Sequence, residues 1–320
     1  MSELDLLVLG DVNPDVIVGG PDVEARFGQV EQLVDHASLV VGGSACITAV
    51  GAGRLGLTVG LCGVVGDDDV GWFMTNRLAE ARIDPSHVRR DPSGPTGMSV
   101  ILDRGHDRAI FTAPGTIAAL SSSDLSALPD RPARHVHVAS YYLMSDSFRD
   151  ALPSALRRFR AAGVSTSVDT NWDPTGQWRL ADLLAETDVF LPNGNELMAV
   201  TKAQTVRDAL ADPRLDGRDV VVKRGELGAF ARLNGAVLSV AATPPPTFCD
   251  AVGAGDTFNA GYLAGRLTGA DPERSLRLAV AAGTLSTRGV GGTAAQPDRS
   301  EAESWAADLS PSDDLEGELR

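Results

Sequence analysis

A chain of 320 residues with 43% hydrophobic residues is long enough to bury a sizeable core and to fold as one large α/β domain. Its formal net charge of −15 makes nucleic acid a poor partner, because a protein that binds DNA or RNA must neutralise phosphates with Lys and Arg. The three cysteines and five histidines show no metal-ligand spacing, and no apolar run is long enough to cross a bilayer. The acidic N-terminus has no basic signal segment, which predicts a cytoplasmic protein.

The N-terminal half alternates short apolar runs with longer segments of helical character. Leu4–Leu9 is apolar and ends in Gly10-Asp11, and Val59–Val65 is a second apolar run. Residues 44–56 and 69–83 have the composition and periodicity of helices. We therefore predict strand, helix, strand and helix in this order.

The second half continues the alternation. Strands are expected at His135–Ser140, Val164–Asp169, Asp188–Leu191 and Asp219–Lys223, and a helix is expected near residues 147–162. Such alternation predicts βαβ units and a parallel sheet. Ligands of parallel sheets bind beyond the carboxyl ends of the strands, which is where several of these strands end in polar residues.

Two stretches interrupt this pattern. Residues 12–41 have no helical period, and residues 95–113 resemble a hairpin with strands at Met98–Leu102 and Arg108–Thr112 and a turn around Gly105. Both stretches follow strand ends on the expected ligand side, so we predict a small β-sheet that folds over the site. The alternative is that both are ordinary surface excursions.

The segment Asp250–Asp256, with sequence DAVGAGD, is the strongest candidate for chemistry. Gly253, Ala254 and Gly255 lead into a helical stretch, and a glycine-rich helix start exposes backbone N–H groups that favour anions. Asp256, in or just before the first turn, can accept the proton of an attacking hydroxyl during phosphoryl transfer. The alternative is that Asp256 only complements the helix dipole.

Several common phosphate-binding patterns are missing from the sequence. It contains no G-x-x-x-x-G-K-[ST], no G-x-G-x-x-G after the first strand and no protein-kinase motifs. The chain is therefore neither a P-loop enzyme nor a protein kinase, and a Rossmann dehydrogenase is disfavoured.

Taken in order, the motifs resemble those of the PfkB family, the ribokinase-like carbohydrate kinases. The resemblance extends over nearly the whole chain, and Asp250–Asp256 is similar to the most diagnostic signature of the family. It implies an α/β fold, a ribokinase-like three-layer sandwich with a mostly parallel central sheet and a small β-sheet lid. The collinear segments are Gly10–Asp15, Gly42-Gly43, Gly63–Gly71, Pro95-Thr96-Gly97, Asn193–Glu196, Lys223–Ala229 and Asp250–Asp256.

For the acceptor, the resemblance implies that Asn13 and Asp15 hold sugar hydroxyls, and their side chains offer the donors and acceptors that vicinal hydroxyls need. An Asx-Pro turn is the alternative role of Asn13. Gly42 and Gly43 would let the sugar approach the backbone. Related sequences often have Lys or Asn after this pair and a further Asn, whereas this chain has Ser44 and Ile47, so the identity of the sugar stays open.

For ATP and Mg²⁺, the resemblance implies residues in three of these segments, Asn193–Glu196, Lys223–Ala229 and Asp250–Asp256. Glu196 suits Mg²⁺ directly or through water, although Asn193 followed by Glu196 also resembles a helix cap. Arg224 is favoured over Lys223 as a phosphate contact because a guanidinium carries a fork of donors. The implied set is Asn193, Lys223, Arg224, Gly225, Gly228, Gly253 and Gly255 for ATP, Glu196 for Mg²⁺, and Asp250 for a monovalent cation such as K⁺.

Three further segments carry weaker signals. Asp169-x-Asn171 matches a strand end of many relatives that often continue with Arg, where this chain has Trp172. Ala282-Gly283 and Gly289–Gly292 are candidates for the wall of an adenine pocket, with close helix packing as the favoured alternative for Gly283. His135 and His137 alternate along a strand and are interpreted as structural.

Together these observations predict an ATP-dependent kinase that phosphorylates a hydroxyl of a small sugar of the fructose, ribose or keto-deoxy type. Asp256 would be the base, and the N–H groups of residues 253–256 would stabilise the moving phosphoryl group. A nucleoside kinase of the same fold and a catalytically silent sensor are the alternatives. We expect one domain over residues 1–310, lid segments at about 12–41 and 92–113 through which a homodimer could form, and an acidic tail at 311–320.

Overall fold

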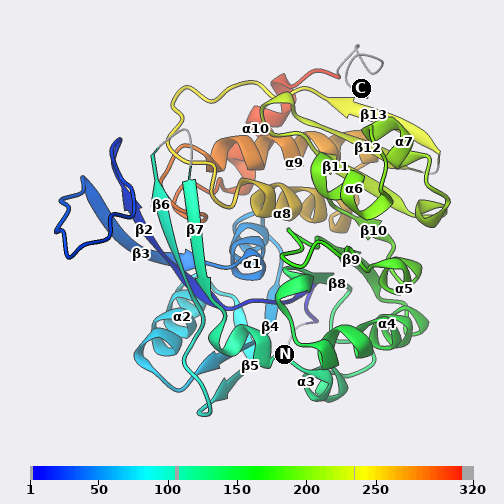
Figure 1. Cartoon of the computed structure of the whole chain (residues 1–320). Coiled ribbons are helices and arrows are strands. Elements are labelled where there is room, and N and C mark those ends of the chain that lie inside the picture. The colour runs from blue at the N-terminus through cyan, green and yellow to red at the C-terminus, as the bar shows by residue number, and fades with distance from the viewer. Residues whose placement is uncertain (1–2, 105–107, 234, 312–320) are drawn as a thin grey trace.

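A nine-stranded sheet forms the centre of the molecule (Figure 1). The computed structural model describes residues 3–104, 108–233 and 235–311. Neighbouring strands of this sheet run parallel, except at one edge, where β12 pairs antiparallel with both β11 and β13. In spatial order the strands are β13 (Ala236–Val240), β12 (Ala229–Leu233), β11 (Asp219–Lys223), β10 (Val189–Phe190), β9 (Ser165–Val168), β8 (His135–Val138), β1 (Leu6–Leu9), β4 (Val59–Gly66) and β5 (Asp84–Asp91).

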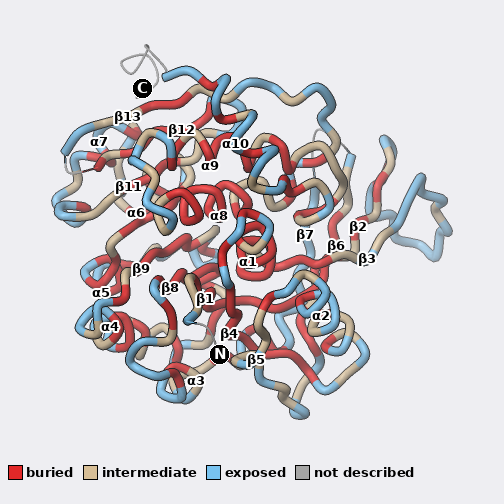
Figure 2. Tube along the Cα trace, turned by 180° about the vertical axis from the view of Figure 1, so that it is seen from behind, coloured by how far each residue is buried: buried red, intermediate tan, exposed pale blue. Residues whose placement is uncertain are grey.

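Helices cover both faces of the sheet and make the three layers (Figures 1 and 2). Successive residues of a strand point to opposite faces, so Leu6 and Val8 of β1 enter one core while Leu7 and Leu9 enter the other. No helix of the described residues is both long and apolar enough to cross a membrane. The first core is covered by α1 (Ser44–Arg54), α2 (Asp69–Glu80), α8 (Ala254–Leu267), α9 (Pro272–Ser286) and α10 (Arg299–Asp308), and the second by α3 (Ser122–Ala127), α4 (Asp146–Ala161), α5 (Ala181–Ala185), α6 (Gly194–Thr201) and α7 (Val206–Leu210).

The two stretches that interrupt the alternation form a separate four-stranded sheet, as predicted. Its spatial order is β3 (His36–Gly42), β2 (Asn13–Gly19), β6 (Met98–Asp103) and β7 (Arg108–Ala113), and we call it the lid sheet. The predicted turn around Gly105 lies outside the described residues. Ile17 and Ile101 of the lid sheet pack on Val252, which attaches the sheet beside the start of α8.

The boundaries differ from the prediction where single residues leave the regular conformation. The helix predicted over residues 69–83 ends at Glu80, and Arg82 has a φ of 61°, which a continuing helix does not allow. The strand predicted over His135–Ser140 ends at Val138, and Ser140 has a φ of 54°. The edge strand Asp84–Asp91 was not predicted, because its polar, half-exposed residues lack a clear period-two pattern.

Two of the collinear motifs join the central sheet to the lid sheet. The hydroxyl of Thr96 accepts a hydrogen bond from the Gly66 amide at 2.8 Å and donates one to Asp68 at 2.6 Å. Asp68 also accepts from the Thr96 amide at 2.8 Å and from the Gly71 amide at 2.8 Å, which caps α2. These motifs therefore have a structural role in this chain, since they fix the chain entering β6 against the end of β4.

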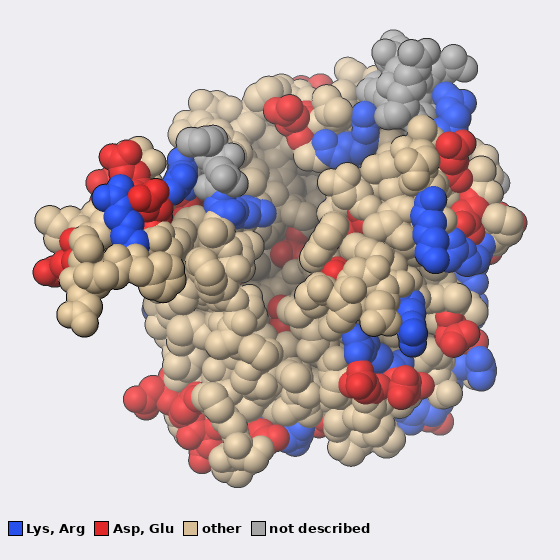
Figure 3. Space-filling model, viewed as in Figure 1, with Lys and Arg blue, Asp and Glu red and all other residues tan. Residues whose placement is uncertain are grey.

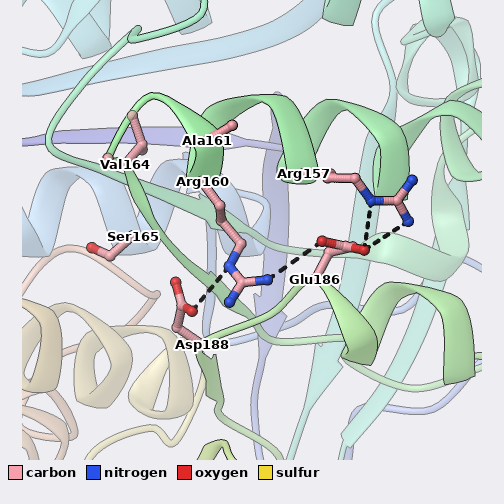
Figure 4. Close-up of a pocket in the computed structure, with 8 residues that line it drawn as sticks. Arg157, Arg160, Ala161, Val164, Ser165, Glu186 and Asp188 are labelled. Carbon is pink, nitrogen blue, oxygen red and sulfur yellow. Dashed lines mark hydrogen bonds and ion pairs between the residues drawn. The ribbon is translucent and has the colours of Figure 1, made fainter.

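The amino edge of the central sheet carries an ion-pair network far from the carboxyl ends of the strands (Figure 4). Glu186 pairs with Arg157 at 2.7 Å and with Arg160 at 3.4 Å, and Arg160 also pairs with Asp188 at 3.1 Å. The network links the last turns of α4 to the residues that precede β10. All four charges have partners, so the shallow hollow that they line offers no unpaired charge to a ligand.

Replacing Glu186 by Gln is expected to lower the free energy of unfolding by about 1 kcal/mol, because two partly exposed arginines lose the charge of their shared, buried partner. Urea denaturation measures this change. The kcat should stay at the wild-type value, because the network lies at the opposite edge from the predicted site. A stability equal to wild type would show that the network contributes nothing.

Candidate active site

Asp256 lies in the first turn of α8 at the carboxyl edge of the central sheet. The helix begins after Gly253, which has a φ of 71° in the left-handed region that favours glycine. A Cβ at this position would lie 2.7 Å from Gly292 Cα, so no larger residue fits without a shift. Asp256 is only 8% exposed and lies in the first turn, where backbone N–H groups have no partner within the helix.

The surroundings of Asp256 favour its protonated form. Burial raises the pKa of its carboxyl to about 8, the charge of Asp169 adds to this, and Lys223 and a hydrogen bond from Ser44 oppose it. A carboxyl with a pKa in this range is a stronger base than an ordinary Asp once it is deprotonated. The site therefore holds a poised proton acceptor at a helix N-terminus.

A buried ion pair lies next to Asp256. Lys223, at the end of β11, donates to Asp169, and Asn259 donates to the same carboxylate at 2.6 Å. Burial alone would lower the pKa of Lys223, but Asp169 and Glu196 offset this and raise it, so the ammonium stays charged. The same contacts keep the pKa of Asp169 below its ordinary value, although burial acts in the opposite direction. One fixed positive charge thus lies on the floor of the site.

Asn193 and Glu196 form the capping box of α6, as the alternative interpretation predicted. The Glu196 amide donates to Asn193 Oδ1 at 2.9 Å, and the Asn193 amide donates to Glu196 Oε2 at 2.8 Å. Burial, together with the charge of Asp169, raises the pKa of Glu196 to about 7. The cap leaves Oε1 of Glu196 available, so a structural role and a role toward Mg²⁺ are compatible.

A cavity of about 430 Å³ opens beside Lys223 and the start of α8. Gly225, Gly228 and Gly255 line it together with Ala254, as expected for a nucleotide site, and Gly283 lines it as well. Gly289–Gly292 do not line it; Gly292 packs on Ile47 and Gly291 on Val40 and Ile17. The remaining lining residues are Lys223, Glu226, Ala242, Thr243, Pro244, Pro245, Phe248, Ala251, Phe258, Val280, Thr284 and Thr287.

Lys223 and Arg224 lie on different sides of the strand end. Lys223 lines the cavity, whereas the Arg224 guanidinium lies 5.4 Å from the centre of the Phe230 ring and is absent from the lining. Of the two candidates, Lys223 lines the cavity in this structure, and the phosphate contact of Arg224 stays a prediction. The donor fork of Arg224 favoured it in the sequence, but Arg224 lies beyond the last residue of β11, where the alternation of strand side chains has ended.

The acceptor candidates meet on the inner face of the lid sheet. Asn13 Nδ2 lies 3.5 Å from both Asp15 Oδ1 and Ser99 Oγ, while the buried Asn13 Oδ1 has no hydrogen-bond partner among the described residues. Burial and the charge of Asp11 raise the pKa of Asp15 to about 7. A Cβ at Gly42 would lie 2.1 Å from Asp15 Cγ, so only glycine leaves room for this carboxyl. An orphaned acceptor beside a carboxyl fits a ligand that carries hydroxyl groups.

Asp11 connects the acceptor side to α1. Its carboxylate accepts hydrogen bonds from the Ser44 amide at 3.1 Å and the Ala45 amide at 2.9 Å, and Gly43, with a φ of 76°, makes the turn into the helix. The Ser44 hydroxyl in turn accepts from Asn171 Nδ2 at 2.8 Å. Ser44 therefore has a polar role in the site, whereas Ile47 packs against Gly253 and Gly292.

Asp250 lies at the other end of the signature segment. Its two carboxylate oxygens accept hydrogen bonds from the amides of Val252 at 2.8 Å and Gly291 at 2.9 Å. These contacts fix the loop before α8. Each oxygen keeps a further lone pair, so the predicted role toward a monovalent cation stays open to test.

Sequence reasoning missed several residues of this site. Asn259 is one turn after Asp256 on the same helix, and this spacing could have identified it. Asp11 was noted only as a polar strand end. Ser99 and Phe248 carry no pattern in the sequence that marks them. Figure 3 shows the result in three dimensions: acidic side chains lie inside a hollow, and basic side chains lie on its rim.

The residues present fit ATP and Mg²⁺. Mg²⁺ is usually held by one or two carboxylates, water and substrate phosphates, and Glu196 and Asp169 offer carboxylates close to Lys223. In the described part of the chain no three His, Cys, Asp or Glu side chains converge on one point. The cavity beside Gly225, Gly228 and Gly255 has the size and apolar walls that a nucleoside needs.

Comparison with known proteins gives concordant matches. The family model described as pfkB family carbohydrate kinase matches residues 4–299. The chain is 30% identical to a fructokinase of Klebsiella pneumoniae over 308 residues, which is 91% of this chain and 95% of that protein. It is 32% identical to an ATP-dependent ribose-1-phosphate kinase of Halopiger xanaduensis over 280 residues, 83% of this chain and 88% of that protein.

Solved structures share the fold. A provisionally named ribokinase II of E. coli, in complex with ATP and Mg²⁺, superimposes with a TM-score of 0.83 at 23% identity, covering 95% of this chain and 99% of that one. The adenosine kinase of Sinorhizobium meliloti superimposes with a TM-score of 0.82 at 21% identity, covering 95% of this chain and 99% of that one. The three-layer fold with its small second sheet is thus the ribokinase fold.

Proposed function

Because this chain belongs to the pfkB family of carbohydrate kinases and is an ATP-dependent sugar kinase, we propose that Asp256 is its catalytic base. The acceptor hydroxyl gives its proton to the Asp256 carboxylate while its oxygen bonds to the γ-phosphorus. The bond from that phosphorus to the β–γ bridging oxygen breaks, and ADP leaves. The N–H groups of residues 253–256 donate to the phosphoryl oxygens during this step.

The other predicted residues take roles on the two sides of Asp256. Lys223 supplies positive charge to the phosphates, and Gly225, Gly228 and Gly255 let the nucleotide approach the backbone. Asn13, Asp15, Gly42 and Gly43 bind the sugar, with Asn13 Oδ1 free to accept from a hydroxyl. Mg²⁺, when bound with ATP beside Glu196, neutralises charge on the phosphates.

One observation supports this assignment above the others: Asp256 lies between the nucleotide cavity and the acceptor cluster. Its neighbours Ala254 and Gly255 line the cavity, while its carboxyl interacts with Ser44 and Asp11 of the acceptor side. The direct experiment measures ADP release with a panel of fructose, ribose, keto-deoxy sugar acids, sugar phosphates and nucleosides. ADP release with nucleosides alone would show that the acceptor is a nucleoside. Binding without ADP release would show that the chain is a sensor.

The kcat/KM for the acceptor is expected to rise with pH, to reach half its maximum near pH 8 and to level off about one pH unit higher. Asp256 must be deprotonated to act, and its raised pKa of about 8 places this step in the measurable range. The Glu196 and Asp15 carboxyls, with pKa values of about 7, titrate on the same limb. Initial rates between pH 6 and pH 9 test the expectation, and a profile that is flat or falls over this range contradicts it.

We also propose that the chain forms a homodimer through the outer face of the lid sheet. The strand register aligns Leu39, Val16, Val100 and Phe111 in one row across β3, β2, β6 and β7, opposite to the Asp15 face. Phe111 is 56% exposed and Leu39 is 45% exposed. An apolar row across a whole exposed sheet is typical of an interface.

Phe111→Asp is expected to convert this dimer to a monomer, because the new charge would be buried in the interface. Light scattering coupled to size-exclusion chromatography measures the mass of both proteins. A wild-type protein that is already monomeric at micromolar concentration would contradict the proposal.

Three smaller assignments complete the proposal. Residues 1–310 act as one kinase domain; of the acidic tail predicted at 311–320, Pro311 pairs with Val240 and the remainder lies outside the described residues. Asp250 contributes to a K⁺ site, which comparing activity in KCl and choline chloride tests. The enzyme works in the cytoplasm, where ATP and Mg²⁺ are supplied.

A further inference from the structure

A column of four polar side chains runs through the apolar core beneath α8. His135 and His137 of β8 are paired in register with Ser165 and Ser167 of β9. The His135 ring bonds Ser165 Oγ through Nδ1 and Ser167 Oγ through Nε2, and His137 Nδ1 bonds the same Ser167 Oγ, each at 2.7 Å. Both imidazoles are fully buried. Polar groups persist in such a core when they are hydrogen-bonded, and this column satisfies every ring nitrogen except one.

The exception is His137 Nε2, which has no partner among the described residues. It lies at the end of the column nearest the active site. The next residue on the same face, directly after the end of β9, is Asp169, the carboxylate that holds Lys223 and Asn259. The other end of the column, Ser165, lines the shallow hollow at the amino edge of the sheet (Figure 4). The column therefore spans the sheet from one edge to the floor of the active site.

We propose that His137 is a positioning residue for phosphoryl transfer: Ser167 holds its ring at Nδ1, and its Nε2–H faces the Asp169–Lys223 pair and fixes the place of the Lys223 ammonium. The inference rests on the proposed role of Lys223. It concerns a residue that touches neither substrate, and it assigns a task to a histidine that the sequence indicated was only structural.

The hydrogen-bond chemistry supports one tautomer. The charged groups that face His137 are Asp169, directly after β9, and Lys223 on β11, with His135 beside it on β8. Burial lowers the pKa of His137 to about 4, Asp169 opposes this, and Lys223 adds to it, so the ring is neutral at pH 7. A neutral ring does not compete with Lys223 for Asp169 as a second cation would. With hydrogen on Nε2 the ring directs the positive end of an N–H dipole toward Asp169 without a direct hydrogen bond in this structure, and the Ser167 hydroxyl then donates to Nδ1.

The test uses two substitutions that each keep one half of the ring's function. Asn keeps an amide near Nδ1 only, whereas Gln reaches the position of Nε2. His137→Asn is expected to lower kcat by about 10- to 100-fold with little change in the KM for the sugar, because Lys223 shifts within the site. His137→Gln is expected to restore most of this kcat. Equal kcat values for the Asn and Gln variants would overturn the proposal.

His135→Asn is the matched control, since it opens the same column one ring further from the site. It should lower Tm about as much as His137→Asn and leave kcat near wild type; an equal loss of kcat would assign the effect to general destabilisation and sink the proposal. If neither His137 variant folds, ¹⁵N NMR of the wild-type histidines tests the proposal. The proposal requires the ring hydrogen of His137 on Nε2, and a ring hydrogen on Nδ1 would overturn it. Failure of the base assignment is seen separately, in Asp256→Asn.

Discussion

Asp256→Asn is expected to lower kcat by about 10²- to 10⁴-fold, the usual loss when a general base is removed, while the affinity for ATP stays close to wild type. Asn has nearly the same shape, so the N–H groups at the start of α8 keep their place, but an amide cannot take the acceptor proton. Steady-state kinetics and ATP binding by calorimetry measure the two parts. A kcat near wild type would exclude Asp256 as the base.

The same variant is expected to be more stable than wild type at pH 8 and above. Burial raises the pKa of Asp256 to about 8 in the folded chain from an ordinary value of 3.8, so the folded state binds a proton that the unfolded state has lost. The contribution of Asp256 to the free energy of unfolding is therefore largest at low pH, below the ordinary pKa, and decreases as the pH rises toward 8. Asn removes this loss, and Tm measured against pH should show it.

Asp69→Asn is the matched control for both measurements. Asp69 is also an acid in the first turn of a helix, α2, but it is exposed. Its substitution should change the free energy of unfolding by only about 0.3–1 kcal/mol and leave kcat unchanged. This comparison separates base chemistry from the stabilisation of a helix dipole, the two interpretations that the sequence left open.

Lys223→Met is expected to impair both catalysis and folding. The phosphates lose the positive charge that lines the nucleotide cavity, which should lower kcat by about 10²- to 10³-fold. The buried Asp169 carboxylate also loses its cation, and an uncompensated buried charge costs about 3–5 kcal/mol. Initial rates and urea denaturation measure the two effects.

The double variant Lys223→Met with Asp169→Asn separates these effects. Removing the carboxylate charge should recover most of the stability, because no unpaired charge remains in the core. Activity should not recover, because the phosphates still lack their cation. Recovery of both would show that Lys223 acts only by keeping the site folded. As a third comparison, Arg224→Met should keep the wild-type kcat if its guanidinium does not contact the nucleotide.

The sequence predicted the order of strands and helices and the site at the carboxyl edge of the sheet because these features are local. Apolar periodicity marks a strand or a helix, and parallel strands bring their carboxyl ends to one edge. The glycine-rich start of α8 was recognised in the same way, since its backbone requirement lies within one short segment. The lid sheet was predicted from the missing helical period of residues 12–41, the hairpin pattern of residues 95–113 and the position of both after strand ends.

Only the tertiary structure decided which side chains act together. The three-dimensional arrangement decides that Lys223 lines the nucleotide cavity and Arg224 does not, and the pKa of Asp256 is raised first by its burial and then by the charge of Asp169, which follows β9. The row of apolar residues on the lid sheet is formed only by the register of its four strands. The column from Ser165 to His137 is likewise formed only by the register of β8 and β9. Burial and charge act through space, so they depend on segments that a single stretch of sequence does not bring together.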